Sequence, residues 1–414
     1  MTDCRFCRAP LTRTFVDLGR APLSNAFLSA EQLRLPEAHY PLHAYVCDDC
    51  LLVQLEEFAS PETIFGDYLY FSSYSDVWLR HAEAYAARMI EQLRLDARSL
   101  VVEVASNDGY LLQYFRQGGI DVLGVEPAAN IAEVARAKGI ATEVAFFGVT
   151  TARRLAAARQ ADLVCANNVL AHVPDLNDFV AGLAILLKPL GTITLEFPHL
   201  LRLIAERQFD TIYHEHFSYF SLLSVDRVFA HHGLKVVDVD RLATHGGSLR
   251  IHACHSTAGR ERTERFHDVL AEELAAGLAE AATYERFGAA VIDVKCDVLE
   301  FLISARREGK TVVGYGAPAK GNTLLNYCGV GPELMRFTVD RSPHKQGRYL
   351  PGSQIPIFAP EQILTARPDY VFILPWNLRD EIVEQMHAVR EWGGRFVVPI
   401  PRIEVLRGRP TAVA

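Results

Sequence analysis

The sequence lacks the features that mark nucleic-acid-binding, secreted and membrane-spanning chains. Its 414 residues carry a formal net charge of −8 and no run of lysines or arginines, so the basic field that nucleic-acid binders need is missing. The first thirty residues hold cysteines, prolines and charges where a signal peptide has an apolar core, and no stretch approaches about 18 consecutive apolar residues. We therefore expect a cytoplasmic protein without a nucleic-acid or membrane partner.

Disulfides are not expected among the eight cysteines, because a reducing compartment keeps thiols free. Two CxxC pairs, Cys4 with Cys7 and Cys47 with Cys50, bracket a small module rich in cysteine, proline and short apolar runs. Together they supply the closed four-sulfur shell of a structural zinc ion. A redox role is the weaker interpretation, because neither pair sits between a strand and a helix. The other four lie singly in apolar surroundings and are interpreted as core residues: Cys165, Cys254, Cys296 and Cys328.

Internal repeats and low-complexity segments are also missing, but the composition changes along the chain. A chain of 414 residues exceeds the roughly 250 to 300 residues of a single core. Strand-like runs alternate with helical stretches in two zones, which predicts two α/β domains with mainly parallel sheets, and "LKVVDVDRL" with "LRIHACH" predicts a terminal antiparallel hairpin. The predicted parts are a zinc module (1–66), a central domain (67–258), a helical connector (259–308) and a C-terminal α/β domain (309–414).

The first strand-turn-helix of the central domain lacks the GxGxxG pattern of NAD-binding loops. The run "SLVVEVASNDGYLLQYF" predicts a buried strand, a tight turn and a helix. The next strand, "DVLGVEP", ends in Glu126, where an acid can accept hydrogen bonds from ribose hydroxyls. A third strand, "DLVCANN", brings Asn167, Asn168 and His172 of "HVPD" to the same sheet edge. NAD binding is the rival reading, but it offers no role for "HVPD".

These elements resemble the class I S-adenosylmethionine-dependent methyltransferases. The resemblance implies a Rossmann-like fold in which the first turn holds the methionine part of the cofactor, Glu126 holds the ribose and "AFFG" from Ala145 flanks the adenine. The sequence departs from the family where Ala105 and Asn107 replace the usual glycines. The implied cofactor-binding residues are Glu103, Ala105, Asn107, Gly109, Glu126, Pro127, Phe146, Phe147, Asn167 and Asn168.

A second candidate nucleotide loop, "TVVGYGAPAKGNTLLNY", follows the connector. It is not a Walker A loop, because Gly321 breaks the GK[ST] order. Backbone amides at a helix start, together with Lys320, suit a pyrophosphate, and Lys345 and Arg348 add cations downstream. A tight strand-helix junction with a surface lysine explains the motif equally well, and both interpretations stay open.

The stretch "TIYHEHFSYF" at 211–220 groups Tyr213, His214, Glu215 and His216. In an extended segment the two histidines would share a face while Glu215 pointed away, which is a weak arrangement for a metal. Histidines satisfied within an aromatic core are a second interpretation. The third is general base catalysis, because histidine titrates near neutral pH and a neighbouring glutamate or tyrosine can orient it or stabilise an oxyanion.

Over nearly its whole length the chain resembles the nucleotide-sugar C-methyltransferases of deoxysugar and branched-sugar pathways. The motifs that carry the resemblance are, in order, both CxxC pairs, "DLG" at 17–19, "YFSSYS" at 70–75, "SNDG", "YHEHF", "HGG" at 245–247 and "GYGAPAKG". It implies a monomeric enzyme with a structural zinc module, a central methyltransferase domain and a C-terminal α/β domain, with the nucleotide sugar bound between the last two.

The same resemblance implies the chemistry. His216 removes the proton beside the keto group of a nucleotide-linked (dTDP) 4-keto-deoxyhexose, and that carbon, C-3 before C-5, takes the methyl group and leaves S-adenosylhomocysteine. The implied catalytic residues are His216, Tyr213, Glu215, His172 and Tyr70, and the implied substrate contacts are Tyr68, Gly246, Gly247, Tyr315, Lys320, Asn322 and Arg348. His214 receives no role. The rivals are C-5 methylation, sugar O-methylation and an inactive zinc-scaffolded binding protein.

Overall fold

The computed structural model describes residues 3–60, 72–74 and 76–406, and the chain divides into two compact units. The predicted site residues Tyr68 and Tyr70 lie outside the described residues. Unit 1 consists of Met1–Arg13, Val46–Leu200 and His216–Glu280, and unit 2 of Thr14–Tyr45, Leu201–Glu215 and Ala281–Ala414.

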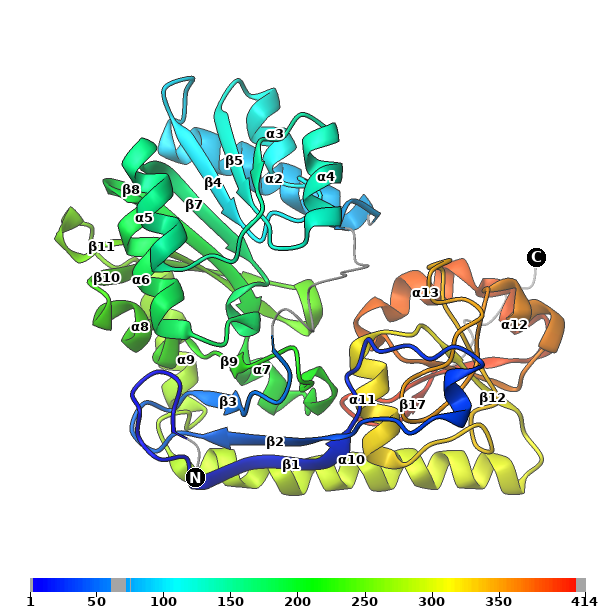
Figure 1. Cartoon of the computed structure of the whole chain (residues 1–414). Helices are drawn as coiled ribbons and strands as arrows, with labels where there is room; N and C mark the ends of the chain where they lie inside the picture. The colour runs from blue at the N-terminus through cyan, green and yellow to red at the C-terminus, as the bar shows by residue number, and fades with distance from the viewer. Residues whose placement is uncertain (1–2, 61–71, 75, 407–414) are drawn as a thin grey trace, which may run out of the picture. The chain divides into compact units, whose positions relative to one another are not determined.

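Unit 1 is built on a seven-stranded sheet in the order β10-β11-β8-β7-β4-β5-β6 (Figure 1). Its strands are β4 Leu100–Val104, β5 Asp121–Val125, β6 Thr142–Glu143, β7 Ala161–Asn167, β8 Leu187–Pro198, β10 Leu234–Leu242 and β11 Ser248–His255. The strands β4 to β8 are parallel, whereas β11 is antiparallel to both β8 and β10. The predicted parallel sheet with a terminal hairpin is confirmed.

Helices flank this sheet, and Figure 1 shows α5 and α6 in front of it and α2 behind. Their bounds are α2 Asp76–Leu93, α3 Leu112–Gln117, α4 Ala129–Ala137, α5 Val149–Ala158, α6 Leu176–Leu186, α8 Leu222–His231 and α9 Glu264–Ala275. The helix α6 begins where the Asp175 side chain accepts a hydrogen bond from the Asp178 amide, and α8 begins at a capping box of Ser221 and Ser224. Two short strands, β3 Val53–Leu55 and β9 Ser218–Tyr219, pair antiparallel.

Unit 2 holds a six-stranded sheet in the order β14-β13-β12-β15-β16-β17. Its strands are β12 Val312–Tyr315, β13 Thr338–Val339, β14 Ile357–Phe358, β15 Tyr370–Ile373, β16 Arg395–Val398 and β17 Glu404–Val405, and all but the antiparallel β17 run parallel. Its helices include α10 Ala281–Arg307, α11 Ala319–Cys328, α12 Glu361–Ala366 and α13 Arg379–Gln385. The neighbouring strands β1 Arg13–Ala21 and β2 Tyr40–Val46 contribute most of their residues to this unit, and α7 Leu200–Ala205 begins at the boundary. The second predicted α/β fold is confirmed.

The interpretation of Cys296 as a core residue is wrong, because its side chain is exposed. The buried face of α10 is made by Val291, Val294, Val298 and Leu302, which recur at the three- and four-residue spacing of a helix. Cys296 falls off that face although its sequence neighbours are apolar. The other three cysteines of that group, Cys165, Cys254 and Cys328, are buried as expected.

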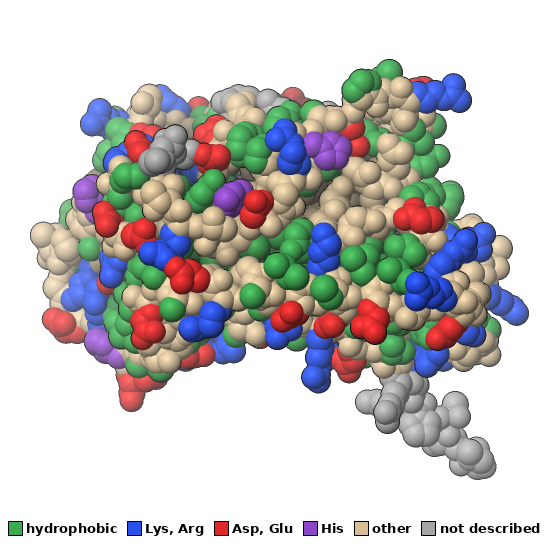
Figure 2. Space-filling view, turned by 90° about the horizontal axis from the view of Figure 1, so that it is seen from below, with side chains coloured by type: hydrophobic (Ala, Val, Ile, Leu, Met, Phe, Trp, Pro, Cys, Tyr) green, Lys and Arg blue, Asp and Glu red, His purple; other side chains and the backbone are tan. Residues whose placement is uncertain are grey.

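The surface carries both signs of charge. Figure 2 shows acidic and basic side chains interspersed over the face that it presents, in keeping with the 42 basic and 50 acidic residues of the chain. Within the described ranges, no helix is both long and apolar enough to span a bilayer.

Candidate active site

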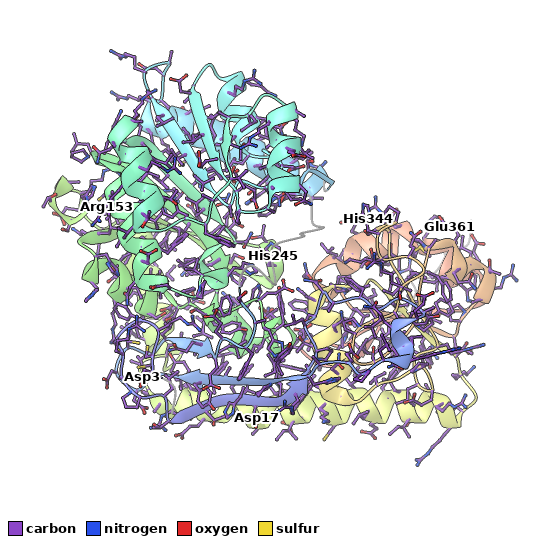
Figure 3. All side chains as sticks on the ribbon, viewed as in Figure 1. Asp3, Asp17, Arg153, His245, His344 and Glu361 are labelled. Atoms are coloured by element: carbon purple, nitrogen blue, oxygen red, sulfur yellow. The ribbon has the colours of Figure 1, made fainter. Side chains whose placement is uncertain are left out.

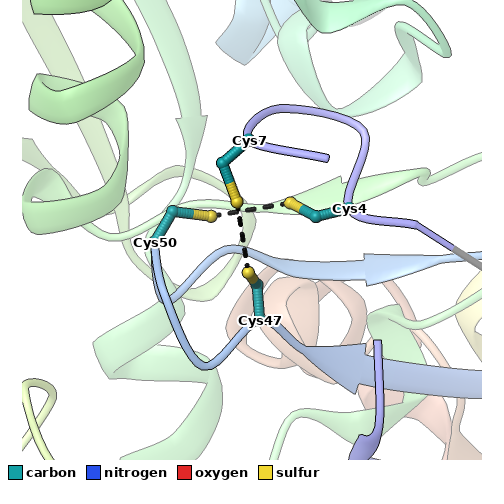
Figure 4. Close-up of side chains that lie close together, drawn as sticks. All are labelled: Cys4, Cys7, Cys47 and Cys50. Carbon is teal, nitrogen blue, oxygen red and sulfur yellow. Dashed lines mark hydrogen bonds between the residues drawn. The ribbon is translucent and has the colours of Figure 1, made fainter. Parts of the chain in front are cut away.

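The four cysteines of the CxxC pairs meet in unit 1. Their sulfur atoms all lie within 4.8 Å of one another, with Cys4 and Cys50 3.6 Å apart and Cys7 and Cys47 3.4 Å apart. Figure 4 shows the four side chains converging from two loops. In the part of the chain that the structure describes, this is the one group of three or more potential metal ligands. The predicted convergence of the four cysteines is confirmed, and a four-sulfur shell fits tetrahedral Zn²⁺.

The turn after β4 adopts the backbone conformation that glycine usually supplies. Ala105, Asn107 and Gly109 have φ angles of 53°, 48° and 78°, all in the left-handed region. The two residues that depart from the family's glycines are therefore the ones that carry the strained conformation. At Gly109 an added Cβ would lie 3.0 Å from the Ile140 side chain, so this glycine also permits close packing.

Glu126, which follows β5, fixes this turn. Its carboxylate accepts one hydrogen bond from the Asn107 amide at 2.9 Å and another from the Ala128 amide at 3.0 Å. Burial raises the pKa of Glu126, and the two backbone donors oppose that shift. Each carboxylate oxygen keeps a second lone pair, so the group can also accept from the hydroxyls of a ribose.

Several buried oxygens at this sheet edge have no hydrogen-bond partner among the described residues. They are Ser106 Oγ, Asp108 Oδ1, Asn167 Oδ1, Asn168 Oδ1 and both carboxylate oxygens of Glu103. Burial raises the pKa of Glu103 well above its usual range; the nearby Tyr110 hydroxyl opposes this without forming a hydrogen bond of normal geometry. Unpartnered buried acceptors are costly, so their concentration here indicates a ligand that brings donors or positive charge.

The two phenylalanines of "AFFG" differ in exposure. Phe146 is 46% exposed, whereas the Phe147 ring packs against Phe179 with centroids 5.4 Å apart. Pro127, directly after Glu126, is half-buried. Of the two phenylalanines predicted beside the adenine, Phe146 is therefore the more exposed.

Sequence reasoning missed an aromatic group next to this edge. The Trp78 ring of α2 stacks on Tyr110 at 5.9 Å and meets the His245 ring edge-on at 5.7 Å. His245, labelled in Figure 3, begins the "HGG" turn, in which Gly246 and Gly247 also have positive φ angles of 88° and 111°. A tryptophan in an amphipathic helix gives no signal of this proximity, because it depends on the sheet order.

A buried ionic cluster is hydrogen-bonded to Thr244, the residue that precedes the "HGG" turn. Glu196 of β8 is fully buried and accepts from Arg250 at 2.7 Å and from Thr244 at 2.8 Å, with His81 Nε2 at 3.0 Å. Burial opposes ionisation, but these partners hold the pKa of Glu196 below its usual value. The sequence does contain a signal of this cluster, because a charged residue interrupts each of the apolar runs "TITLEF" and "LRIHACH".

His172 and His216 come together in unit 1. His172 ends the 3-10 turn Leu170–His172 that follows β7, and its ring centroid lies 4.7 Å from that of His216 at an interplanar angle of 66°. The Phe217 amide donates to the Ala171 carbonyl at 2.7 Å, so the backbone beside one histidine is bonded to the backbone beside the other. Both imidazoles are half-buried and stand at the sheet edge that bears the β4 turn.

The first three residues of "YHEHF", Tyr213, His214 and Glu215, belong to unit 2. The expectation of an extended segment is wrong, because His214 and Glu215 form a turn. His214 is buried, its Nε2 donates to the Pro41 carbonyl at 3.1 Å, and its ring meets Tyr40 edge-on. Burial lowers its pKa, which keeps this imidazole neutral. His214 is therefore a core histidine, which supplies the role that the sequence left blank.

Glu215 is also buried, and burial raises its pKa to about 7. Its Oε1 accepts from the Asn25 side chain at 2.7 Å, and Lys345 opposes the shift electrostatically. A carboxyl group with such a pKa can hold or release a proton near neutrality. Tyr213 is half-buried.

In the β12 turn of unit 2 the chain satisfies several of its own polar groups, but the buried Asn322 Oδ1 at the start of the following helix has no partner among the described residues. The Ala317 amide donates to Asp340 at 2.7 Å, and the Ala317 carbonyl accepts from Lys345 at 2.9 Å. An added Cβ at Gly316 would lie 2.5 Å from Pro375, and one at Gly314 2.6 Å from Thr338. The tight-junction interpretation of this motif therefore accounts for these two glycines.

Three of the four predicted substrate side chains in unit 2 have hydrogen-bond partners within that unit, and the fourth is exposed. Tyr315 is buried and its hydroxyl donates to Gln385 at 3.2 Å, Asn322 donates to the Ser24 carbonyl at 2.6 Å, and Arg348 is exposed. Lys320 donates to Asn377 at 2.9 Å and lies 4.5 Å from the Trp376 ring centroid. Burial lowers the pKa of Lys320, and the buried Asp210 carboxylate opposes that shift.

Comparison with known proteins decides the family. The C-methyltransferase NovU of Streptomyces niveus is 39% identical to this chain over 410 residues, covering 99% of this chain and 98% of that protein. The chain belongs to the C-methyltransferase family. Family models agree in parts: a zinc binding domain at residues 4–65, a methyltransferase domain at 78–239 and a C-methyltransferase C-terminal domain at 243–401.

Two solved methyltransferase structures overlap this C-methyltransferase over less than half of its length. The magnesium protoporphyrin IX methyltransferase of Synechocystis PCC 6803 is 16% identical, with a TM-score of 0.34 and coverage of 47% of this chain and 88% of that one. An S-adenosylmethionine-dependent methyltransferase of Clostridium acetobutylicum is 10% identical, with a TM-score of 0.35 and coverage of 44% and 94%.

The methyl donor of this C-methyltransferase is S-adenosylmethionine, and the β4 edge of unit 1 fits it. Unpartnered acceptors suit the ammonium and sulfonium charges of the methionine part, and Glu126 suits the ribose. The individual cofactor contacts stay predictions. The methyltransferase fold of this enzyme therefore lies in unit 1, which also contains the four-cysteine zinc site.

Proposed function

We propose that this enzyme methylates a carbon beside the keto group of a nucleotide-linked 4-keto-deoxyhexose, with dTDP as the nucleotide and C-3 as the carbon. The observation that carries the proposal is the pair of imidazoles of His172 and His216, 4.7 Å apart at the sheet edge that bears the β4 turn. A carbon nucleophile requires a base, and a histidine pair supplies a proton acceptor and a second group for the developing oxyanion.

In the proposed reaction, His216 takes the proton from the carbon beside the ketone and the electron pair moves onto the keto oxygen. His172 is half-buried and its ring meets that of His216 edge-on, so it is the candidate donor to that oxygen. When bound, S-adenosylmethionine supplies an electrophilic methyl group to the carbon. Tyr213 and Glu215, adjacent in sequence, stay the predicted partners, and a Glu215 pKa of about 7 is compatible with proton exchange.

C-3 and C-5 both flank a C-4 ketone, so the same base chemistry serves either carbon. The position depends on which carbon the bound sugar presents to His216. For the nucleotide, the cation of Lys320 and the start of α11 Ala319–Cys328 offer a positive environment, which supports an anionic substrate part in unit 2.

The product identifies the reaction. The purified enzyme is incubated with S-adenosylmethionine and dTDP-4-keto-6-deoxyhexoses, and the product is analysed by mass spectrometry and carbon-proton NMR. The expected product gains one methyl group on carbon, at a new quaternary or branched C-3. Two methyl groups on one carbon would instead show C-5 methylation, and an O-methyl signal would contradict the proposal.

The role of His216 is tested by His216→Asn. We expect the variant to bind S-adenosylmethionine with wild-type affinity and to lose about 10²- to 10⁴-fold of its methyl transfer rate, the range for loss of a general base. His267→Asn, on the exposed side of α9, is the matched control and keeps full activity. Near-normal turnover by His216→Asn would remove this residue from the mechanism.

A further inference from the structure

Arg5 lies between the candidate zinc ligands Cys4 and Cys7 in the sequence, and its side chain donates hydrogen bonds to two backbone carbonyls of other segments. Its Nη1 donates to the Pro174 carbonyl at 2.6 Å and its Nη2 donates to the Leu55 carbonyl at 2.5 Å. The guanidinium carbon also lies 5.4 Å from the centroid of the Phe217 ring. One side chain of the loop that carries Cys4 and Cys7, the metal loop, therefore contacts three other segments of unit 1.

Each of those segments leads directly to the histidine pair. Pro174 is two residues after His172 in the turn that follows β7. Phe217 directly follows His216; its carbonyl accepts from the Leu55 amide at 3.0 Å and its amide donates to the Ala171 carbonyl at 2.7 Å. The backbone beside each histidine is thus linked to Arg5 by hydrogen bonds. Beside His172 the link is the Pro174 carbonyl, and beside His216 it runs from Phe217 through Leu55.

The metal loop is itself firmly held. The Gln54 side chain accepts from the Arg5 amide at 2.8 Å and donates to the Cys4 sulfur at 3.1 Å. The Asn177 side chain, on α6, donates to the Phe6 carbonyl at 2.9 Å. The four cysteines would hold one zinc ion, and this shared ion would fix the same loop. The position of the guanidinium is thereby set by the module that carries the metal.

We propose that Arg5 is a positioning residue that sets the relative orientation of the His172 and His216 imidazoles. The zinc module then aligns the proton-transfer pair in addition to stabilising its own fold. A guanidinium suits this task because two carbonyls from separate segments need two donors in a rigid fork, which lysine cannot offer. The inference rests on the proposed role of His216 as the base.

The test compares Arg5→Met, Arg5→Lys and the control Arg8→Met, whose residue lies exposed in the same loop. The rate of deuterium wash-in beside the keto group is measured in deuterated water, without S-adenosylmethionine, together with the zinc content and the Kd for S-adenosylmethionine. We expect Arg5→Met to lose about 10- to 100-fold in the exchange rate, as small misplacements of reacting groups do, with zinc content and Kd unchanged. Arg5→Lys should recover part of the loss, Arg8→Met should match the wild type, and in full turnover the loss should fall on kcat more than on KM.

Two results would overturn the proposal. Wild-type exchange by Arg5→Met would show that Arg5 does not position the pair, and loss of zinc together with exchange would show a purely structural role. If the wild-type enzyme itself exchanges no deuterium, the proposed function fails separately. Arg5 is then judged by the rate at which diethyl pyrocarbonate modifies His216, read by peptide mass spectrometry: a change of about threefold or more in Arg5→Met supports positioning, and an unchanged rate contradicts it.

Discussion

The turn after β4 in unit 1 and the turn after β12 in unit 2 share one construction. In each, a carboxylate at the end of the neighbouring parallel strand holds a backbone amide of the turn. Glu126 accepts from the Asn107 amide at 2.9 Å, and Asp340 accepts from the Ala317 amide at 2.7 Å. Both carboxylates also accept from an amide two residues further along their own segment, that of Ala128 and that of Ser342.

The two turns differ in what remains unsatisfied. Beside the β4 turn, buried oxygens of Glu103, Asn167 and Asn168 lack partners within the described ranges. At the β12 turn, Lys345 donates to the Ala317 carbonyl and close packing explains the glycines, although Asn322 Oδ1 also lacks a partner among the described residues. A shared supersecondary structure does not imply a shared ligand, and the larger number of unsatisfied oxygens favours the β4 turn as the cofactor turn.

The largest expected effect separates the two carboxylates. Glu126→Ala should weaken S-adenosylmethionine binding by about 100-fold, because it removes the anchor of the turn together with the ribose acceptor. Asp340→Ala should leave this Kd within about twofold and instead lower stability by roughly 2 kcal/mol, since it deprives two amides of a charged acceptor. Isothermal titration calorimetry and chemical denaturation measure both. Equal effects of the two substitutions on the Kd would break the distinction.

A second prediction concerns the pH dependence of stability in unit 2. The pKa of Glu215 is raised to about 7 by burial, above its ordinary value of 4.5, so the folded chain binds a proton that the unfolded chain has released between these values. Stability due to this group is therefore highest below pH 4.5 and falls as pH rises to 7, by about 2 kcal/mol between pH 5 and 7. Glu215→Gln should flatten this part of the denaturation profile, and an unchanged slope would contradict the burial argument.

The smallest expected effect tests the backbone of the β4 turn. Ala105→Gly should stabilise unit 1 or leave it neutral, within about 1 kcal/mol, because it relieves a left-handed φ of 53° at the expense of a more flexible unfolded chain. Gly316→Ala in unit 2 is the opposite change and should destabilise, since its Cβ would lie 2.5 Å from Pro375. Thermal unfolding of both variants distinguishes them, and a clear loss of stability in Ala105→Gly would contradict the strain argument.

Local patterns were sufficient to predict the cluster of four cysteines and both α/β folds. The CxxC pairs indicate a metal site because the two cysteines of each pair are close in sequence. The alternation of strands with helices indicates a parallel sheet because it recurs along the chain. Likewise, "SNDG" and Glu126 pointed to one edge, since the ends of parallel strands meet there.

Contacts between segments that are far apart in the chain could not be predicted from the sequence. The bond from His214 to the Pro41 carbonyl and that from Arg5 to Pro174 join residues far apart in the chain, and no local period encodes them. For the same reason, the contact between the Trp78 and His245 rings could not be predicted from the sequence. A shared active site for His172 and His216 was implied only by resemblance to a family, and the structure adds the close approach of the two rings and the backbone hydrogen bond beside them.

The central claim is that His216 removes a proton from carbon, and solvent exchange at C-3 tests it most directly. The dTDP-4-keto sugar is incubated with enzyme in deuterated water without S-adenosylmethionine, and the C-3 proton signal is followed by NMR for the wild type, His216→Asn and His267→Asn. We expect enzyme-dependent loss of that signal with the wild type and with His267→Asn, and a rate lower by at least about 10²-fold with His216→Asn. Exchange by His216→Asn at the wild-type rate, or no exchange by the wild type, would contradict it.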